Sequence, residues 1–349
     1  MQNIASIDSN FKVDTELKIN DIKFLNINQP PFKIYGVFYE AGKYRRLPEN
    51  IAVTVNDGVY SFHAHTAGGR VRFKTNSPYI AIHVKMPNIV KMPHFALTGS
   101  AGFDMYIGKS PEKYYATFIP PFEIQNGYES VVYFDSAELR EININFPLFS
   151  EVSELYIGIS NNSELYSPEP YKYQKPIVYY GSSITHGGCA SRPGNSYESI
   201  VSRKLDADYI NLGFSGSARA EEEIAEYISS LPMSVFVYDY DHNAPTAEHL
   251  NKTHERMFKV IRKTNPLLPI VMLSRPKISL SAEEEKRLEI IKTTYQNAID
   301  SGDNNVYLLD GRTLMNLAEY EGTVDGCHPN DIGFMSMAAA LGDVLKRIL

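Results

Sequence analysis

The order of apolar and polar residues divides the chain into two halves with different periodicity. Residues 1 to about 165 contain many short segments in which apolar and polar side chains alternate, separated by Pro, Gly, Asn and Ser. Alternation of this kind is typical of half-buried β-strands. The predicted strands are VYSFHAHT and RVRFKT around a glycine turn, then YIAIHVKM, GFDMYI, YYATFI, VVYFD, EININF and ELYIGIS. Short strands without helical spacing between them predict a β-sandwich or jelly roll.

The second half alternates short apolar runs with longer segments of helical spacing. The predicted strands are PIVYYG, DYINLG, SVFVYDYD, LPIVMLSRP and NVYLLDG. A segment of helical spacing follows each of them, and the helix that begins after Ser281 carries a capping box formed with Glu284. Strands that alternate with helices predict a parallel sheet with helices on both faces.

A proline-rich segment joins the two halves. The chain has 349 residues, which is long for one domain and sufficient for two. The segment SPEPYKYQKP is the predicted linker. We therefore predict a β-sandwich domain over residues 1–168, a linker over 169–175 and an α/β domain over 176–349.

Composition argues against several classes of function. The net charge is −7, whereas sequence-independent binding of nucleic acid needs a positively charged surface. The sequence has no apolar run of the roughly 18 residues that a membrane span needs. The first residues lack a basic stretch followed by an apolar one, so no signal peptide is expected. The compartment stays open, since an exported protein whose leader had been removed would look the same as a cytoplasmic one.

Candidate chemistry lies where the predicted strands of the second half end. In open parallel sheets, ligands bind at the carboxyl ends of the strands. Two adjacent serines, Ser182 and Ser183, follow the first of these strands. Neighbouring residues that leave a strand point in opposite directions, so only one serine should face a pocket. Gly216 follows the second strand, Asn243 the third and Arg275 the fourth.

The loop before the last helix supplies a base and a partner for that base. A serine hydroxyl becomes a nucleophile only when a base accepts its proton, and the base needs an orienting group. His328 follows Asp325 by three residues, so a tight loop can fold the carboxylate onto the imidazole. Backbone N–H groups at Gly216 and Ser183, with the carboxamide of Asn243, are suited to hold an oxyanion.

Four segments resemble, in order and spacing, the sequence blocks of the SGNH, or GDSL-like, hydrolase superfamily. They are YGSSITHG, NLGFSG, DYDHN and DGCHPND, and the resemblance covers residues 176–349. GFDMY at 102–106 resembles a motif of the β-rich N-terminal domain in a subgroup of these enzymes. The whole chain is similar in organisation to carbohydrate esterases that combine a jelly roll with an SGNH domain and remove acetyl groups from sugars.

The resemblance implies a role for each matching residue. Ser183 matches the nucleophile, and Asp325 and His328 match the other two members of the triad. Gly216 and Asn243 match the oxyanion-hole positions, to which the backbone N–H of the nucleophile also contributes.

The sequence also departs from the family pattern at two places. Ser182 stands where the family has an aspartate, so the bracing of that turn is in question, and DYDHN lacks the usual glycine of the third block. The implied fold is a flavodoxin-like three-layer α/β/α sandwich, which agrees with the alternation of strands and helices. The implied chemistry runs through an acyl-serine without a metal or cofactor.

We therefore predict a serine esterase that removes O-acetyl groups from carbohydrate and acts on a small-molecule or glycan ester. A lipase or thioesterase is the alternative with the same chemistry, although DYDHNAP and CASRPGN look too polar to wall an apolar channel. A non-catalytic glycan-binding protein on the same scaffold is the alternative from another class. A glycosidase would need two carboxylates flanking a cleft, and no such pair can be placed. The oligomeric state stays open.

Five further residues near these blocks have more than one interpretation. His186 could contact substrate or act as a rival base, but a rim or packing position is favoured. Arg192 and Arg275 could each bind a sugar hydroxyl or an acid group, or form a salt bridge. Cys189 and Cys327 flank the two catalytic segments, and a disulfide and a reduced pair are equally consistent with the sequence.

Two more groups of residues could suggest other sites. His63 and His65 would lie on one face of a predicted strand at a spacing that suits a metal. A zinc site needs three or four ligands and no third is evident, so a solvated face is favoured and no metal is predicted. Asp239 and Asp241 could replace Asp325 as the orienting group, although Asp239 is expected still to lie within its strand.

Overall fold

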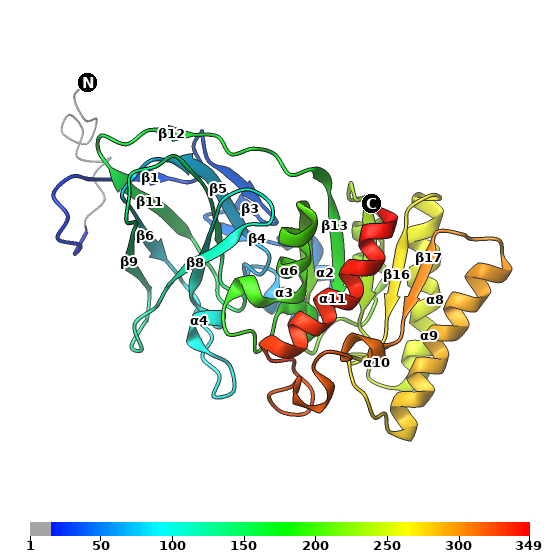
Figure 1. Ribbon diagram of the computed structural model, residues 1–349. Helices are drawn as coiled ribbons and strands as arrows, with labels where there is room; N and C mark the ends of the chain where they lie inside the picture. Colours follow the sequence, from blue (N-terminus) through cyan, green and yellow to red (C-terminus); the bar gives the residue numbers. More distant parts are fainter. Residues whose placement is uncertain (1–14) are drawn as a thin grey trace.

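The computed structural model describes residues 15–349 and contains a β-sandwich beside a three-layer α/β domain (Figure 1). The sandwich occupies one side of the molecule, and a parallel sheet with helices on both faces occupies the other (Figure 1). The two predicted architectures are therefore confirmed.

Two antiparallel sheets form the sandwich. The strands of this half are β1 (Ile22–Asn26), β2 (Lys33–Tyr35), β3 (Phe38–Glu40), β4 (Lys43–Arg45), β5 (Arg70–Thr75), β6 (Tyr79–Lys85), β7 (Phe103–Ile107), β8 (Lys113–Phe118), β9 (Gly127–Tyr133), β10 (Arg140–Asn145), β11 (Glu154–Ser160) and β12 (Leu165–Tyr166). One sheet has the order β1–β11–β6–β9, and the other has the order β12–β5–β10–β7–β8 with β2 paired to β5. Side chains such as Phe73 and Ile82 fill the core between them, which accounts for the alternating sequence pattern.

The segment VYSFHAHT is not a strand, and this part of the prediction is wrong. Two helices, α2 (Glu49–Val55) and α3 (Asp57–Phe62), span this region, and a short helix α4 (Leu97–Ser100) lies farther along the chain. Asn56 caps α3, because its side-chain oxygen accepts a hydrogen bond from the N–H of Val59 at 2.9 Å. Val59 is buried in a core of the α/β domain, so packing outside the sandwich overrides the alternating pattern.

Five parallel strands form the sheet of the α/β domain. They are β13 (Tyr173–Gly181), β14 (Ala207–Gly213), β15 (Val235–Asp239), β16 (Ile270–Leu273) and β17 (Val306–Leu309). Their order is β14–β13–β15–β16–β17, which is the order of flavodoxin-like sheets. The first strand therefore lies between the second and the third, and the loops after all three meet at one edge of the sheet.

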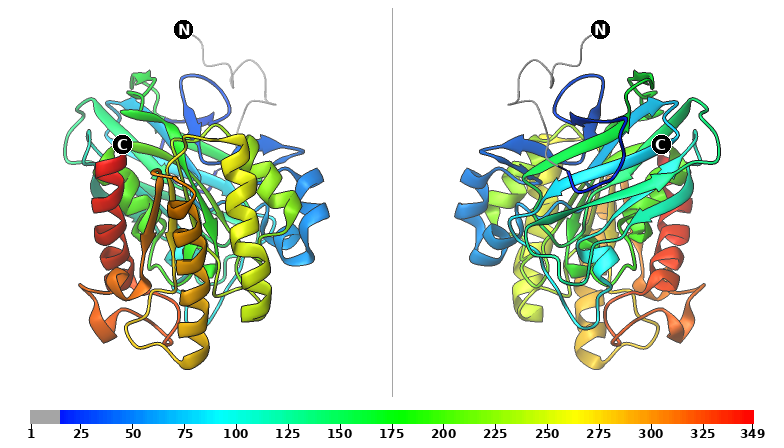
Figure 2. Two further views of the ribbon diagram at one scale, coloured as in Figure 1. Left: turned by 90° about the vertical axis from the view of Figure 1, so that its right-hand side faces the viewer. Right: turned by 90° about the vertical axis from the view of Figure 1, so that its left-hand side faces the viewer.

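The helices of this domain follow the predicted alternation. They are α5 (Ser183–His186), η2 (Pro193–Asn195), α6 (Tyr197–Leu205), α7 (Glu222–Ser230), α8 (Ala247–Thr264), α9 (Ala282–Asp300), α10 (Gly311–Leu314), η3 (Glu319–Glu321) and α11 (Asp331–Ile348). The predicted capping box of Ser281 and Glu284 is present at the start of α9. Figure 2 shows α8 and α9 on the side that faces away from the sandwich. Within residues 15–349, none of the helices combines the length and apolar character needed to cross a membrane.

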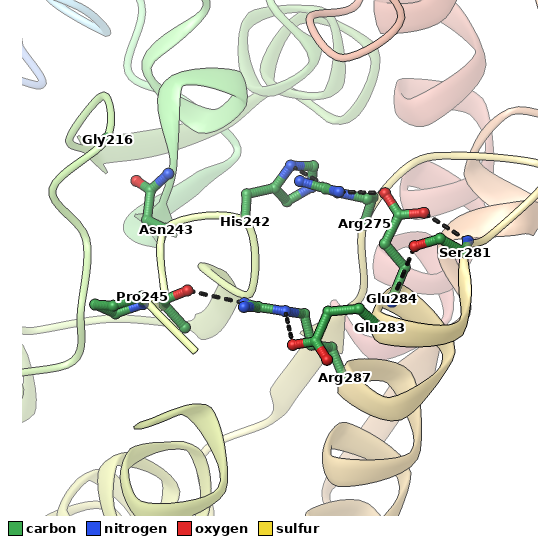
Figure 3. Close-up of a pocket in the computed structure, with 10 residues that line it drawn as sticks. Gly216, His242, Asn243, Pro245, Arg275, Ser281, Glu283, Glu284 and Arg287 are labelled. Atoms are coloured by element: carbon green, nitrogen blue, oxygen red, sulfur yellow. Dashed lines mark hydrogen bonds and ion pairs between the residues drawn. The ribbon is translucent and has the colours of Figure 1, made fainter. Parts of the chain in front are cut away.

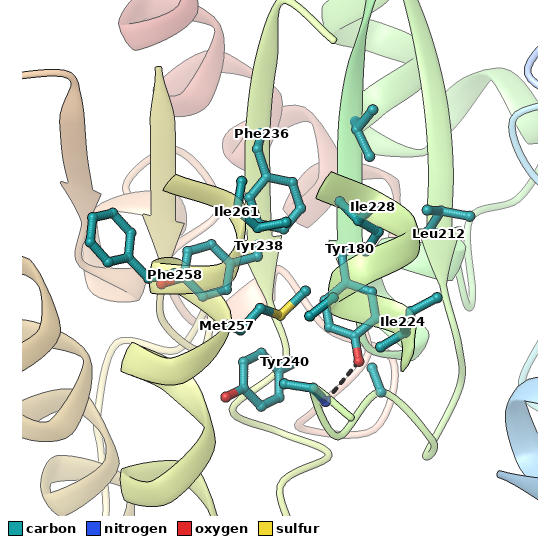
Figure 4. Close-up of a cluster of buried hydrophobic side chains, with 14 of the residues drawn as sticks. Tyr180, Leu212, Ile224, Ile228, Phe236, Tyr238, Tyr240, Met257, Phe258 and Ile261 are labelled. Carbon is teal, nitrogen blue, oxygen red and sulfur yellow. Dashed lines mark hydrogen bonds between the residues drawn. The ribbon is translucent and has the colours of Figure 1, made fainter. Parts of the chain in front are cut away.

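Neighbouring residues of β13 divide between the two cores of the domain. Tyr180 lies in the core that α7, α8 and α9 cover, and Tyr179 lies in the opposite core, under α6 and α11. Figure 4 shows the first core, where Met257 and Ile261 of α8 pack near Tyr238 of β15. Full burial of a side chain such as Met or Ile contributes about 1.5–3 kcal/mol. The two cores thereby fix the ends of the strands and the loops that follow them.

Buried and half-buried polar residues join the sandwich to the α/β domain, and we call this set the interdomain seam. It consists of the buried Arg46, His65, Arg70, Asp104 and His186 and the half-buried Arg192. Arg46 is 2% exposed and donates hydrogen bonds to the backbone oxygens of Asn211 and Gly213 at 3.1 and 2.8 Å. Arg70 pairs with Asp208 and lies 4.0 Å from the ring centre of Tyr209. These bonds cross between the domains and hold them in one arrangement.

Candidate active site

Ser183 begins α5 directly after β13. Ser182 is the cap of this helix: its buried hydroxyl accepts a hydrogen bond from the N–H of Ile184 at 3.1 Å. Ser183 points the other way, and its Oγ lies 2.9 Å from Nε2 of His328. The two serines therefore face in opposite directions, as expected for neighbours that leave a strand, and only Ser183 meets a base.

Gly181 allows Thr185 and the backbone of Asp239 to approach the end of β13 closely. A Cβ atom at this position would lie 2.2 Å from Oγ1 of Thr185 and 2.3 Å from the backbone oxygen of Asp239, so no side chain fits. The N–H of Ser182 donates to the same Asp239 oxygen at 3.0 Å. This backbone bond braces the turn at the position where the family pattern has an aspartate.

The loop between η3 and α11 holds His328 against Asp325. Oδ1 of Asp325 accepts hydrogen bonds from the N–H groups of Cys327 and His328 at 3.0 and 2.8 Å, and Oδ2 lies 2.7 Å from Nδ1 of the His328 ring. Burial alone would raise the pKa of Asp325, but the hydrogen bonds from His328 and Cys327 outweigh it and lower the pKa to about 2. The carboxylate is therefore ionised at neutral pH and fixes the ring.

Gly216 and Asn243 follow β14 and β15, the two strands that flank β13. Gly216 is exposed in a left-handed turn with φ +68°, which favours glycine. Oδ1 of Asn243 accepts a hydrogen bond from the N–H of Ala218 at 3.3 Å, so its Nδ2 group is left to donate elsewhere. Figure 3 shows the Asn243 carboxamide on the side of the loop that carries Gly216.

Two arginines brace the loop that carries Asn243. Nη1 of Arg287 donates hydrogen bonds to the backbone oxygens of Asp241 and Ala244 at 2.7 and 2.8 Å. Nε of Arg275 donates to Nδ1 of His242 at 3.1 Å. Burial, followed by the charge of Arg275, holds the pKa of His242 well below its ordinary value. His242 is therefore a neutral acceptor that ties the loop to Arg275.

Two buried carboxylates lie below the same loop. Asp239 belongs to β15, as predicted, and Asp241 follows it. Burial raises the pKa of both carboxyl groups. In Asp241 the charge of Arg275 opposes this effect, and the resulting pKa is about 6. Neither carboxylate hydrogen-bonds to His328 within the part of the chain that the structure describes; Asp325 does.

A polar pocket of about 430 Å³ opens beside Asn243 (Figure 3). It is lined by Gly216, His242, Asn243, Ala244, Pro245, Arg275, Ser281, Glu283, Glu284 and Arg287. Arg275 pairs with Glu284, whose carboxylate also binds Lys277 at 2.9 Å. The sequence motifs had indicated only Gly216, Asn243 and Arg275. Glu284 and Arg287 come from α9, and their sequence context marks them as ordinary helix residues.

Two residues predicted as substrate contacts lie elsewhere. His186 is fully buried in the interdomain seam, where it stacks on Phe149 with ring centres 3.8 Å apart. Arg192 donates a hydrogen bond to Asp104 at 2.9 Å and lies over the ring of Tyr114. The packing position that the sequence favoured for His186 and the salt bridge that it allowed for Arg192 are both present. A contact of Arg192 with substrate stays a prediction.

His63 and His65 also differ from the prediction. They follow α3 rather than lying on a strand, and both are buried. Nδ1 of His63 contacts the backbone oxygen of Tyr60, and the ring of His65 packs 5.4 Å from that of His186. The expected solvated face is therefore wrong, because the turn after α3 buries His63 against Tyr60 and His65 in the seam.

Cys189 and Cys327 are both free thiols in the described part of the chain, which matches the reduced-pair interpretation. The sequence motifs did not indicate His94, which comes from the sandwich segment KMPHF. Its ring centre lies 5.9 Å from that of His328. A histidine in an irregular loop carries no periodic or motif signal, so only the contact between the domains reveals its place.

Comparisons with known families match both halves of the chain. The model of the GDSL-like lipase/acylhydrolase family matches residues 174–346. The model that describes the N-terminus of SGNH-hydrolase-type esterases matches residues 22–165. No curated protein matches the chain.

Several solved structures have the same two-part fold. One described as a GDSL-like lipase from Bacteroides ovatus is 26% identical with a TM-score of 0.84, covering 94% of this chain and 98% of that one. The salicylyl-acyltransferase SsfX3 from a tetracycline biosynthetic pathway is 18% identical with a TM-score of 0.77, covering 95% and 98%. A family two carbohydrate esterase from Cellvibrio japonicus is 13% identical with a TM-score of 0.62, covering 94% and 98%. With its Ser183–His328–Asp325 arrangement at the edge of a flavodoxin-like sheet, the chain belongs to the GDSL-like lipase/acylhydrolase family, in the branch that carries the N-terminal domain of SGNH-hydrolase-type esterases.

Proposed function

We propose that this hydrolase is a serine esterase that removes short acyl groups, acetyl in particular, from carbohydrate. The observation that carries the proposal is the continuous hydrogen-bond chain from Ser183 through His328 to Asp325. Its members come from a strand end and from the loop before α11. This is the arrangement that activates a serine for acyl transfer.

In the proposed reaction, Oγ of Ser183 attacks the ester carbonyl while its proton moves to Nε2 of His328. The tetrahedral intermediate collapses, the bond to the leaving alcohol breaks, and His328 returns the proton to that alcohol. Asp325 stabilises the imidazolium form of the ring through Nδ1. An acyl-serine remains, which water hydrolyses by the same steps in reverse order.

The oxyanion of the intermediate needs donors that are fixed in advance. We assign this role to the backbone N–H groups of Ser183 and Gly216 and to Nδ2 of Asn243. Their loops follow adjacent strands, and the Asn243 loop is braced by Arg275 and Arg287. Preorganised donors of this kind lower the barrier by about 3–4 kcal/mol each.

Exposure of the site favours water as the acyl acceptor. The side chains of Asp325 and His328 are 36% and 25% exposed, so solvent reaches the base directly. A related fold serves a salicylyl-acyltransferase, and an acyl-serine can pass its acyl group to an alcohol as well as to water. Adding an alcohol to the assay therefore tests whether the acyl group passes to an alcohol as well as to water.

The pocket beside Asn243 supports carbohydrate over lipid. Among the described residues that line it, none is Leu, Ile, Val, Met, Phe, Tyr or Trp, whereas a fatty chain needs an apolar wall. Arg275, Glu284 and Arg287 offer both donors and acceptors, which suits vicinal hydroxyl groups. The likeness to a carbohydrate esterase agrees with this choice.

The test combines active-site labelling with a substrate series. A fluorophosphonate probe should modify Ser183, as mapped by peptide mass spectrometry, and should not react with His328→Ala. Acetylated xylose or glucose should be cleaved faster than octanoyl esters of the same sugar. Faster octanoyl cleavage would support the lipase alternative, and folded protein without any adduct would support the glycan-binding alternative.

A further inference from the structure

Three metal-binding side chains meet at the mouth of the candidate site. His94 comes from the sandwich, Cys189 follows α5 and His328 precedes α11. One ligand atom from each residue lies within 4.8 Å of the other two. Nitrogen and thiolate sulfur are the ligands that zinc prefers. The proposed ester hydrolysis uses His328 but neither His94 nor Cys189.

His328 is already arranged as a zinc-binding histidine usually is. Such a histidine donates its other ring N–H to a carboxylate, and Asp325 holds Nδ1 of His328 at 2.7 Å. Nε2 is therefore the nitrogen that remains, and it now faces Ser183 at 2.9 Å. A metal at Nε2 would take the position of the serine hydroxyl.

Cys189 is held in an unusual backbone conformation. Its φ is +74°, in the left-handed region that a residue with a Cβ atom seldom adopts, and such conformations cluster at binding and catalytic sites. Zinc binds the thiolate form of cysteine, so a metal ion at this sulfur displaces the thiol proton.

His94 can complete the geometry by a small rotation. Zinc bonds of about 2.0–2.3 Å in a tetrahedron set neighbouring ligand atoms about 3.6 Å apart, compared with the limit of 4.8 Å here. His94 is exposed, and within residues 15–349 we find no hydrogen bond that fixes its ring. The exposed ring can therefore move toward the other two ligands.

We propose that His94, Cys189 and His328 together bind a zinc ion, and that the bound ion withdraws His328 from Ser183. The thiol proton leaves to solvent as the sulfur–zinc bond forms. Nε2 of His328 exchanges its contact with Ser183 for a bond to the metal. The fourth position of the zinc is left for water. Ser183 then has no base to accept its proton. Removal of the metal restores the contact between Ser183 and His328.

Binding is tested directly on the untagged full chain. Equilibrium dialysis against zinc chloride should give one zinc per chain. His94→Ala and Cys189→Ser should each weaken binding by at least about 100-fold, because even second-shell partners of zinc ligands change affinity by about 10–100-fold. Cys327→Ser is the matched control and should bind like the wild type. In the cobalt-substituted protein, the thiolate charge-transfer absorption should vanish with Cys189→Ser and persist with Cys327→Ser.

Two results would overturn the proposal. The first is a wild-type chain that takes up no stoichiometric zinc, and the second is His94→Ala binding as tightly as the wild type. The His94 variant keeps this test valid if Cys189→Ser fails to fold, because His94 is exposed. Circular dichroism of each variant confirms that it is folded.

A second arm measures inhibition and rests on the proposed esterase function. Zinc should inhibit ester cleavage by the wild type, a chelator should reverse the inhibition, and His94→Ala should need at least about 100-fold more zinc. Magnesium and calcium should not inhibit, because they prefer oxygen ligands. A chain that binds zinc but cleaves no ester contradicts the proposed function alone. Zinc bound without inhibition contradicts the withdrawal of His328.

Discussion

The interdomain seam and the candidate site use the same residue types in opposite ways. In the seam, Arg46 is 2% exposed and its guanidinium is surrounded by carbonyl oxygens. In the site, the side chains of Asp325 and His328 are 36% and 25% exposed, and among the described residues Nε2 of His328 has its hydrogen bond with the Ser183 hydroxyl. The seam pairs the buried charge of Arg46 with a full set of acceptors, although Nδ1 of His65 and Nδ1 of His186 find no hydrogen-bond partner within residues 15–349. The site leaves donors and a ring nitrogen available.

This difference separates stability from chemistry. A buried charge costs several kcal/mol of desolvation, and only a full set of hydrogen bonds compensates for it. Such a group has no capacity left for a substrate. The exposed site contributes little to stability and retains its capacity to react. Substitutions in the seam should therefore lower the unfolding free energy, and substitutions in the site should lower the activity. The following variants test that division.

The largest effect is expected at Ser183. Ser183→Ala should lower kcat/KM for an acetyl ester by about 10⁴- to 10⁶-fold, because it removes the nucleophile, while the unfolding free energy changes little. Ser182→Ala is the matched control: it should lose about 1 kcal/mol through the missing helix cap and keep most of the activity. The reverse pattern would mean that Ser182 is the nucleophile.

Arg46 should give the largest loss of stability. Arg46→Met should lower the unfolding free energy by about 3–5 kcal/mol, because it leaves buried carbonyl groups without partners. Urea unfolding measures this change. The exposed Arg347 provides the control, and Arg347→Met should stay within about 0.5 kcal/mol of the wild type. Equal stability of the two variants would contradict the structural role of the seam.

Substitution of Asn243 should lower the activity rather than the stability. Asn243→Ala should lower kcat by about 10²- to 10³-fold with little change in KM, because an oxyanion donor acts mainly in the transition state. Steady-state kinetics on an acetyl sugar separates the two constants. A higher KM with unchanged kcat would instead make Asn243 a ground-state contact.

The seam should also make stability sensitive to acid. Burial and the charge of Arg46 lower the pKa of His65 to about 3 and hold that of His186 well below 6.5. Both rings stay neutral in the folded chain but bind protons in the unfolded chain below pH 6.5. The two rings therefore do not lower the unfolding free energy above pH 6.5. As the pH falls below 6.5, the unfolding free energy decreases by up to about 1.4 kcal/mol per pH unit for each ring.

Urea unfolding at several pH values between about 7.5 and 4.5 measures this slope. His186→Phe keeps an aromatic ring for stacking on Phe149 and removes the titrating group. Its profile should be flatter than that of the wild type. An unchanged slope would show that His186 does not contribute to acid lability.

The smallest effect is expected at Arg192. Arg192→Ala should cost about 1 kcal/mol of stability and leave KM unchanged. The loss is small because Asp104 keeps hydrogen bonds from Asn145 and Gly194 at 2.8 and 2.9 Å. A raised KM at unchanged stability would return Arg192 to the substrate site.

The sequence predicted the architecture where local pattern and packing agree. The strands of the parallel sheet are buried apolar runs, and the helix at Ser281 has its own cap, so each can be recognised alone. Pairing of Asp325 with His328 was also predictable, because three residues in one loop suffice to form it. The division of the chain near 169–175 stays a prediction, although β13 already begins at Tyr173.

The errors arise where distant contacts decide the structure. The alternating residues of VYSFHAHT match a strand, yet capping by Asn56 and burial of Val59 against the other domain make a helix. His186 looks like a rival base beside Ser183, yet its ring lies against Phe149 of the sandwich. His94 carries no motif at all. In each case the deciding partner lies in the other domain.

The hydrogen bond between Ser183 and His328 spans 145 positions of the chain. At about 5–20 residues per second, a ribosome adds His328 roughly 7–30 s after Ser183. Throughout that interval the growing chain carries its serine without the base that would activate it. On the proposed mechanism, synthesis itself delays reactivity until almost the whole α/β domain exists, and unfinished chains should be inert toward esters around them.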